Sequence, residues 1–309
     1  MNWLRLTKGF FLACLFLLFF VYMVSGTQMF FQEFSQIQDG GILQANISGA
    51  VQDAESKIAT DKIIQPAPKP EINAEAAISV ESNLADINKT IFEKDSNVKL
   101  PIASLTKLMT AVVVLDNYNF SQNITVDKIS DSQAATKQDV KLGDNMPIES
   151  FFDIMLIESS NKSAYALSQV MGEQKFVDLM NKKATEIGLN STFFADPTGL
   201  SPNNVSTAND LSNFAKYILK NYPKIVDISR TKELVVPNFG KIENTDQLLG
   251  EIPEVVCSKT GFTTQAKGCL LLAVYNAKNN DYLISVILGA DDRFSEMRKL
   301  INWSSAMCN

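Results

Sequence analysis

The hydrophobic and polar positions divide the chain into three segments. Residues 1–26 contain an apolar run, residues 27–72 show no sustained amphipathic period, and residues 73–309 alternate between strand-like and helix-like patterns. The middle segment ends in alternating prolines, which favour an extended and stiff spacer. We therefore predict a short N-terminal segment, an extended linker and one folded domain.

Residues 73–309 predict strands first, then helices, then strands again. Ala76–Glu81 and Lys89–Phe92 have strand-like composition, and Ile148–Gly188 has apolar residues at helical spacing. The other predicted elements are strands at Ile124–Val126, Asp139–Leu142, Glu233–Val236, Pro253–Lys259, Gly268–Tyr275 and Tyr282–Leu288, and a final helix at about Asp292–Trp303. This order predicts an α/β sandwich, with an antiparallel sheet flanked by helices and a helical insertion.

The first segment has the charge pattern of an exported protein. Arg5 and Lys8 precede the uncharged run Gly9–Val24, and basic residues in this position predict that the following chain lies outside the membrane. The run is shorter than the roughly 20 residues that usually span a bilayer, and Val24-Ser25-Gly26 resembles a weak signal-peptidase site. We interpret residues 1–26 as an uncleaved anchor, with a cleaved signal as the alternative. The expected localisation is the cell membrane, through a single N-terminal span with an extracytoplasmic domain, or secretion after cleavage.

Composition excludes several classes of function. The 309 residues carry a formal net charge of −6, and no basic run occurs after residue 26, which argues against a nucleic-acid partner. The chain contains no histidine, which excludes a Ser-His-Asp triad and most zinc sites. We expect neither a metal nor a cofactor.

The cysteines do not indicate a disulfide framework. Cys14 lies in the apolar run, so Cys257, Cys269 and Cys308 remain. Cys257 and Cys269 could form a bridge across a predicted hairpin in an oxidising compartment, or both could be buried free thiols. The sequence leaves both states open.

The first candidate for chemistry is a serine and a lysine three positions apart. Ser104 and Lys107 stand immediately before a long apolar run, at the predicted start of a buried helix. Residues at this spacing share one helix face, so the hydroxyl and the amine can touch. A serine nucleophile needs a base, and without histidine the candidate for that base is a lysine. The same spacing recurs at Ser96/Lys99, so Ser104 could instead be an N-cap beside a solvated lysine.

Two further polar triplets have settings that suit a binding site. Ser159-Ser160-Asn161 interrupts two apolar helical stretches, so it can point inward without crossing a core. Lys259-Thr260-Gly261 ends one predicted strand. There, Gly261 would allow close approach of a ligand, and Lys259 with Thr260 suits a carboxylate. Read alone, this triplet could also be an ordinary exit from a strand into a turn.

Together, in this order, the three motifs resemble the signature of penicillin-recognising serine acyl-transferases. The chain resembles serine D-alanyl-D-alanine carboxypeptidases, the low-molecular-weight penicillin-binding proteins, over about residues 74–290. The segments that carry the likeness are PIASLTKLMTA, LIESSNKSA, FADPTGL and SKTGFT. The resemblance implies a β-lactamase/transpeptidase-like fold. It also implies peptidoglycan stem peptides and β-lactam antibiotics as partners.

The resemblance also implies roles for individual residues. Ser104 would attack the carbonyl between two D-alanines, and Lys107 would take its proton. Lys107 must be neutral for that step, and we expect burial and the nearby charge of Lys259 to lower its pKa. Ser159 would relay a proton to the leaving D-alanine, after which water would hydrolyse the acyl-enzyme.

The remaining motif residues would bind the substrate. Asn161 would bond to the substrate backbone, while Lys259 and Thr260 would hold the terminal carboxylate beside Gly261. The backbone N–H groups of Ser104 and Phe262 would form the oxyanion hole. The sequence does not separate carboxypeptidase from endopeptidase action, nor does it identify the diamino acid of the stem peptide.

Two other functions compete with this interpretation. A class A β-lactamase shares the three motifs and adds a glutamate in a Glu-x-x-x-Asn element, which Glu186 to Asn190 matches nominally. Glu186 ends an apolar helix, so we interpret it as a solvated helix end. The second alternative is a non-catalytic, membrane-tethered binder of peptidoglycan or β-lactams. The presence of every expected catalytic group argues against it.

Overall fold

The computed structural model describes residues 68–84, 88–137 and 139–308, which belong to one compact unit. The predicted N-terminal segment, residues 1–26, and nearly all of the linker, residues 27–72, lie outside the described part. Within it, no helix combines the length and the apolar character needed to cross a membrane. This finding overturns the predicted localisation at the cell membrane through an N-terminal span. We withdraw that localisation.

The unit is built on a five-stranded antiparallel sheet with the strand order β2-β1-β11-β10-β9. These strands are β1 (Ala76–Ser82), β2 (Asn88–Lys94), β9 (Val255–Thr263), β10 (Lys267–Asn276) and β11 (Asp281–Ala290). Since β1 pairs with β11, the two ends of the folded chain meet inside one sheet. The strand β9 stands at an edge, where it can border a site.

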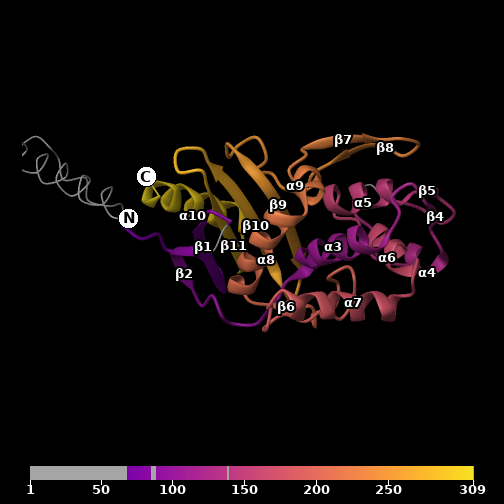
Figure 1. Cartoon of the computed structure of the whole chain (residues 1–309), viewed down its shortest axis with the longest axis horizontal. Helices are drawn as coiled ribbons and strands as arrows, with labels where there is room; N and C mark the ends of the chain where they lie inside the picture. The colour runs from indigo at the N-terminus through magenta and orange to yellow at the C-terminus, as the bar shows by residue number, and fades with distance from the viewer. Residues whose placement is uncertain (1–67, 85–87, 138, 309) are drawn as a thin grey trace, which may run out of the picture. The chain divides into compact units, whose positions relative to one another are not determined.

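Both faces of the sheet are covered, so its central strands are mainly apolar on both sides rather than alternating. The buried Ser79 and Ser285 are exceptions, and their hydroxyls bond to each other at 2.8 Å. On β10, Leu271 and Ala273 belong to one core, while Leu270 and Leu272 belong to the core on the opposite face. The helix α8 (Ala208–Asn221) packs on the first face and α10 (Arg293–Met307) on the second. Figure 1 shows these three layers, with α8 in front of the strands.

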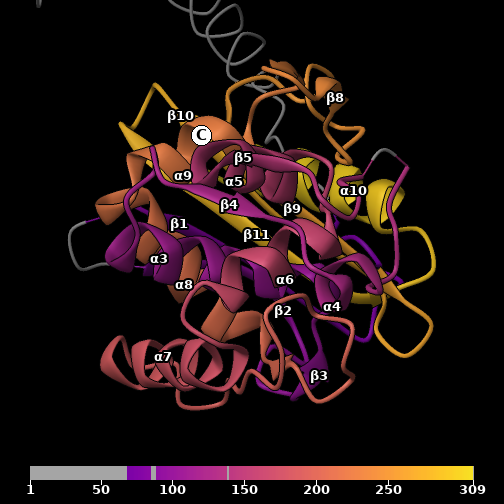
Figure 2. The ribbon, with the colours of Figure 1, turned by 90° about the vertical axis from the view of Figure 1, so that its right-hand side faces the viewer.

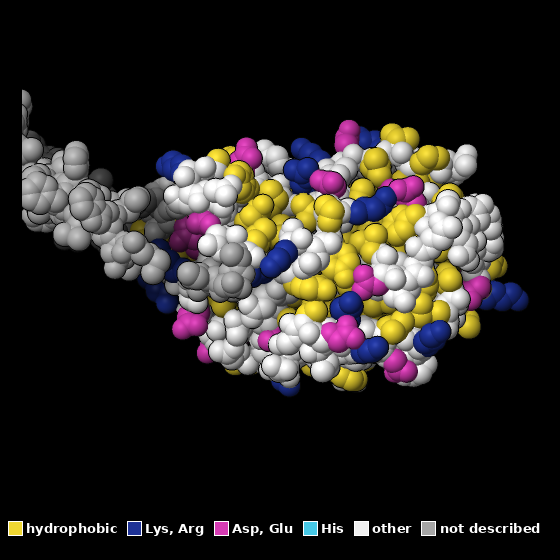
Figure 3. Space-filling model, viewed as in Figure 1, with side chains coloured by type: hydrophobic (Ala, Val, Ile, Leu, Met, Phe, Trp, Pro, Cys, Tyr) yellow, Lys and Arg dark blue, Asp and Glu magenta, His cyan; other side chains and the backbone are white. Residues whose placement is uncertain are grey.

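The helical insertion lies beyond one end of the sheet (Figures 1 and 2). It contains α3 (Lys107–Asn117), α4 (Lys128–Asp131), α5 (Ile148–Ile157), α6 (Asn161–Gln169), α7 (Glu173–Glu186) and α9 (Pro223–Ser229). Short pairs of strands connect these helices, namely β3 (Leu100–Pro101) with β6 (Val205–Ser206), β4 (Asn123–Thr125) with β5 (Asn145–Pro147), and β7 (Glu233–Val236) with β8 (Gly240–Glu243). The helix α3 is buried on nearly all sides. In Figure 3, hydrophobic side chains gather in the middle of one face, with basic and acidic side chains interspersed among them.

The predicted strand at Asp139–Leu142 is wrong, because the described residues there form a loop. The Asp139 carboxylate accepts hydrogen bonds from the backbone N–H groups of Thr136 and Val140, at 3.1 and 3.0 Å. Such local side-chain bonds compete with a strand ladder. β4 therefore pairs with β5, further along the chain.

Cys257, Cys269 and Cys308 are free thiols. Cys257 stands opposite Ala273 in the β9–β10 ladder, and Cys269 stands opposite Gly261, so the two cysteines are four positions out of register. Burial raises the pKa of the Cys257 thiol to about 11. Of the two states that the sequence leaves open, the structure has the buried thiols.

Candidate active site

Ser104 lies on a short 3₁₀ turn, η1 (Ala103–Thr106), which continues directly into α3. The sequence predicts this position as the first turn of a helix, and the structure winds that turn more tightly. Ala103 has a φ of +46°, a left-handed conformation that costs free energy for a residue with a side chain. Ser104 itself is half-buried and lines a cavity, whereas most of α3 behind it is buried.

Lys107 is fully buried beneath Ser104. Its Nζ donates to Ser104 Oγ at 2.9 Å, to Asn161 Oδ1 at 2.7 Å and to the Thr198 carbonyl at 2.7 Å. These three bonds match the three protons of an ammonium. Burial lowers the pKa of Lys107 to about 7, although the negative charges of Asp196 and Asp139 raise it. Near neutral pH, a large share of Lys107 is therefore uncharged and able to accept a proton.

Ser159 lies in the break between α5 and α6, as the sequence predicts. Its φ of +62° is a second left-handed conformation at a residue other than glycine. The Ser160 hydroxyl accepts from the Ser163 N–H at 2.9 Å and so caps the start of α6. Because the cap starts the helix there, Asn161 occupies its first position, from which its side chain reaches Lys107.

Lys259 lies on the edge strand β9 and is almost fully buried. Its Nζ donates to Ser159 Oγ at 2.8 Å and to the Thr260 carbonyl at 3.0 Å. Burial lowers its pKa well below the usual value, and the charges of Lys107 and Arg293 lower it further, against the attraction of Asp246. The sequence predicts that burial and the charge of Lys259 lower the pKa of Lys107. Burial is the main cause at both lysines, and the repulsion between the two charges adds to it.

A cavity of about 320 Å³ joins these groups. The predicted site residues among its lining are Ser104, Ser159, Asn161, Thr260, Gly261 and Phe262. A Cβ atom at Gly261 would lie 3.0 Å from the Ser104 backbone nitrogen. Glycine at this position therefore lets the backbone of β9 pack closely against η1. Phe262 is 62% exposed at the rim. Lys107 and Lys259 lie behind the wall and touch its serines.

Comparison with known proteins decides the family. A family model described as D-alanyl-D-alanine carboxypeptidase matches residues 63–292, most of the chain. The chain belongs to the D-alanyl-D-alanine carboxypeptidase family. It is thus a serine peptidase, and the resemblance stated from the sequence is confirmed.

Individual members of this family agree with the match. The chain is 31% identical to D-alanyl-D-alanine carboxypeptidase DacF of Bacillus subtilis over 75% of its length, and the alignment spans 62% of that relative. It is 32% identical to a D-alanyl-D-alanine endopeptidase of Escherichia coli, over 82% of this chain and 84% of that protein. The cefotaxime-bound structure of penicillin-binding protein D2 from Listeria monocytogenes superposes with a TM-score of 0.69. It shares 25% identity and covers 77% of this chain and 99% of that chain, which confirms the predicted fold class.

The β-lactamase alternative depends on Glu186, and the structure does not support that role. Glu186 ends α7 with a side chain that is 48% exposed, and it forms ion pairs with Lys182 and Lys183. It is not among the residues that line the cavity. It is thus a solvated helix end, as we interpreted it.

Sequence reasoning missed several groups of this site. Asp196 accepts from the N–H groups of Thr198, Gly199 and Ser201 at 2.6–2.7 Å, and this turn aims the Thr198 carbonyl at Lys107. The turn-rich FADPTGL segment could have signalled it. Arg293 also lines the cavity from the start of α10. Its buried Nε has no hydrogen-bond partner among the described residues. No local pattern marks it, because only the β11–α10 connection brings it there.

Gly199 provides a prediction about the turn that holds Ser104. It has a φ of +88°, and a Cβ atom there would lie 2.0 Å from the Ala103 carbonyl oxygen. We expect Gly199→Ala to cost more than about 3 kcal/mol of unfolding free energy and to slow acylation of Ser104 at least tenfold, because the Ala103 turn must shift. Gly172 has the same φ of +88° with no atom within 4 Å, so Gly172→Ala is the matched control.

The control variant should lose only about 1 kcal/mol, the cost of the left-handed conformation, with acylation unchanged. Thermal unfolding and penicillin acylation rates measure both effects. Equal losses of stability and acylation rate in the two variants would show that the contact with Ala103 is unimportant.

Proposed function

We propose that this protein is a serine D-Ala-D-Ala carboxypeptidase, which removes the terminal D-alanine from peptidoglycan stem peptides through an acyl-enzyme on Ser104. The observation that carries the proposal is the contact between a fully buried Lys107, with a pKa of about 7, and a serine at the wall of a cavity. That pair supplies a nucleophile and a base without histidine. We also propose that residues 73–309 form the catalytic domain and residues 27–72 an extended linker.

In the proposed reaction, neutral Lys107 takes the Ser104 proton while Oγ attacks the carbonyl carbon between the two D-alanines. The backbone N–H groups of Ser104 and Phe262 stabilise the oxyanion that develops. Since Lys259 donates to the Ser159 oxygen, the Ser159 proton can point into the cavity toward the leaving nitrogen. The peptide bond breaks as Ser159 gives its proton to that nitrogen and regains one from the Lys107 ammonium, so both groups return to their starting states. Water then hydrolyses the ester on Ser104.

Positive groups at one end of the cavity suit the terminal carboxylate of the substrate. Arg293 supplies positive charge, and Thr260 supplies a hydroxyl whose oxygen lies 2.5 Å from Thr245 Oγ1. Lys259 lies behind this wall with a lowered pKa, and a bound carboxylate would favour its charged form. The Nε of Arg293, to which no described residue bonds, is a donor that a carboxylate could satisfy. Asn161 bonds to Lys107 and to the Ala134 carbonyl at 2.9 Å, and in the proposed complex its amide would also contact the substrate backbone.

We propose that β-lactams bind in the same cavity. These antibiotics combine a reactive cyclic amide with a nearby carboxylate, so they can use the same nucleophile and cationic end. The cefotaxime-bound relative supports this proposal.

Release of D-alanine from a synthetic stem pentapeptide tests the proposal, with a peptide that ends in L-alanine as the control. We expect release from the D-Ala-D-Ala peptide only. A protein that cleaves cross-linked dimers but leaves the pentapeptide intact would be an endopeptidase. If a β-lactam binds but neither peptide is cleaved, the non-catalytic binder would be the better account.

A further inference from the structure

Two charged side chains from opposite walls meet over the cavity. Lys137 lies on the loop between α4 and β5, and Glu243 ends β8. Their Nζ and Oε2 atoms are 3.4 Å apart, and both residues line the same cavity as Ser104, Ser159 and Thr260. They are 106 positions apart in the chain, so only the fold brings them together.

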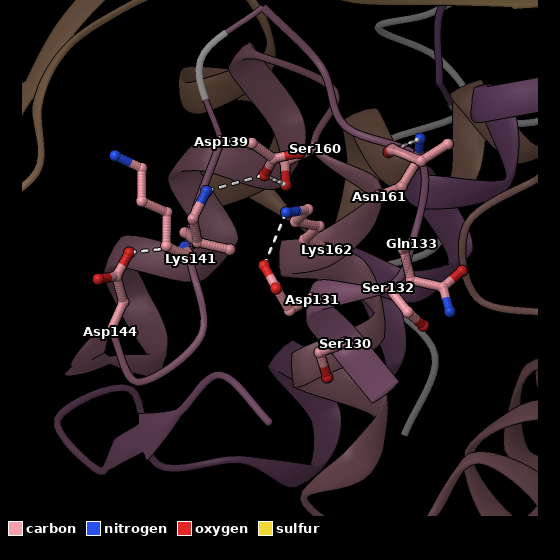
Figure 4. A network of polar contacts seen from close by, with 12 residues as sticks. Ser130, Asp131, Ser132, Gln133, Asp139, Lys141, Asp144, Ser160, Asn161 and Lys162 are labelled. Atoms are coloured by element: carbon pink, nitrogen blue, oxygen red, sulfur yellow. Dashed lines mark hydrogen bonds and ion pairs between the residues drawn. The ribbon is translucent and has the colours of Figure 1, made fainter. Parts of the chain in front are cut away.

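Hydrogen bonds and an ion pair hold the backbone segments that carry Lys137 and Glu243. The loop that carries Lys137 is anchored to α6, where Ser160 donates to Asp139 and Lys162 pairs with Asp131 at 2.7 Å. Figure 4 shows both contacts, one from Asp139 to Ser160 and one from Lys162 to Asp131. On the other wall, the Glu243 N–H donates to the buried Glu158 carboxylate at 3.0 Å. The backbones are thus held, while the charged ends remain in solvent.

The pair itself is weak. The Lys137 side chain is 82% exposed and the Glu243 side chain 55%, and such exposed pairs shift an equilibrium by at most about fivefold. Lys241 also reaches Glu243, at 3.7 Å, but it lies closer to Glu233, at 2.7 Å. A ligand that offers its own cation and anion can therefore replace the Lys137–Glu243 contact at little cost.

We propose that Lys137 and Glu243 recognise a zwitterionic side chain on the stem peptide, and that the substrate belongs to the diaminopimelate class rather than the lysine class. An amine and a carboxylate on one carbon stand about as far apart as the two protein charges, so both ion pairs can form side by side. A lysine side chain offers only the amine, and it would leave Lys137 without its partner. This inference rests on the proposed function, because it concerns the substrate of the same cavity.

Two synthetic stem pentapeptides that differ only at the third residue, meso-diaminopimelate or L-lysine, test the inference. We expect kcat/KM for D-alanine release to favour the diaminopimelate peptide about fivefold, and the preference to shrink as salt screens the pairs. Lys137→Ala should bring the ratio below about twofold, since it removes the partner of the extra carboxylate. Glu243→Gln should lower both rates and keep the ratio, because both peptides carry the amine.

Lys89→Ala is the matched control, since Lys89 and Glu81 are also 3.4 Å apart but lie on β2 and β1. It should leave the ratio unchanged. Equal rates on the two peptides, from a protein that penicillin acylates on Ser104, would overturn the inference and leave the proposed function intact. Absence of both acylation and D-alanine release would overturn the proposed function and the inference together. Equal acceleration of both peptides by Lys137→Ala would show that the pair only covers the cavity, which also contradicts the inference.

Discussion

Replacement of Ser104 by alanine is expected to lower kcat/KM for D-alanine release by at least about 10⁴-fold. The hydroxyl is the only group in the proposed reaction that forms a covalent bond with the substrate. Without it, the oxyanion donors and the carboxylate site can supply only a small residual rate. The assay is D-alanine release from the pentapeptide, with circular dichroism to verify folding.

Ser96 is the matched control for this variant. It stands three residues before Lys99, as Ser104 stands before Lys107, but its hydroxyl donates to Glu93 rather than contacting a lysine. Ser96→Ala should keep full activity. Retention of more than about one hundredth of the wild-type rate by Ser104→Ala would require another nucleophile.

Replacement of Lys107 by methionine is expected to lower the rate of acylation by about 10³-fold, the usual contribution of a positioned base. The apolar chain still fills the buried space, but Ser104 loses its proton acceptor. Lys107→Arg keeps a positive charge and should be equally inactive, because a guanidinium does not deprotonate near neutral pH. Penicillin acylation rates measured by stopped flow would quantify both variants.

The pH profile separates a base from a merely structural lysine. Lys107 acts when neutral, and its pKa is about 7, so acylation should rise with pH through that value and level off above it. Below the pKa, the rate should fall about tenfold per pH unit as the ammonium forms. An acylation rate in Lys107→Met within about tenfold of wild type, with the same pH limb, would assign the base to another group.

Local patterns predicted most of the fold. Strands such as Tyr282–Leu288 are short apolar runs between turns, so each one could be located within a few residues. The error at Asp139–Leu142 arose because Asp139 bonds to neighbouring backbone groups, an interaction that hydrophobic periodicity does not reveal. The helix α9 was missed because Pro223–Ser229 is only seven residues long and is separated from α8 by a single residue, Tyr222.

The site was predictable only where its groups lie close together in the sequence. Ser104 and Lys107 touch across one turn, so their spacing alone suggested the contact. Asn161 meets Lys107 across 54 positions. The family resemblance brought Asn161 into the site but assigned it to the substrate backbone, so this contact was not predicted. Arg293 was not predicted, because it belongs to none of the sequence motifs and has no characteristic spacing from the other site residues.

Intact mass spectrometry of the purified protein after brief exposure to benzylpenicillin tests the central claim most directly. We predict a persistent adduct of one penicillin on the wild-type chain and none on Ser104→Ala, because the acyl-enzyme forms on that oxygen. A wild-type protein that destroys the antibiotic without a lasting adduct would be a β-lactamase. An adduct that survives in Ser104→Ala would contradict the assignment of Ser104 as the nucleophile.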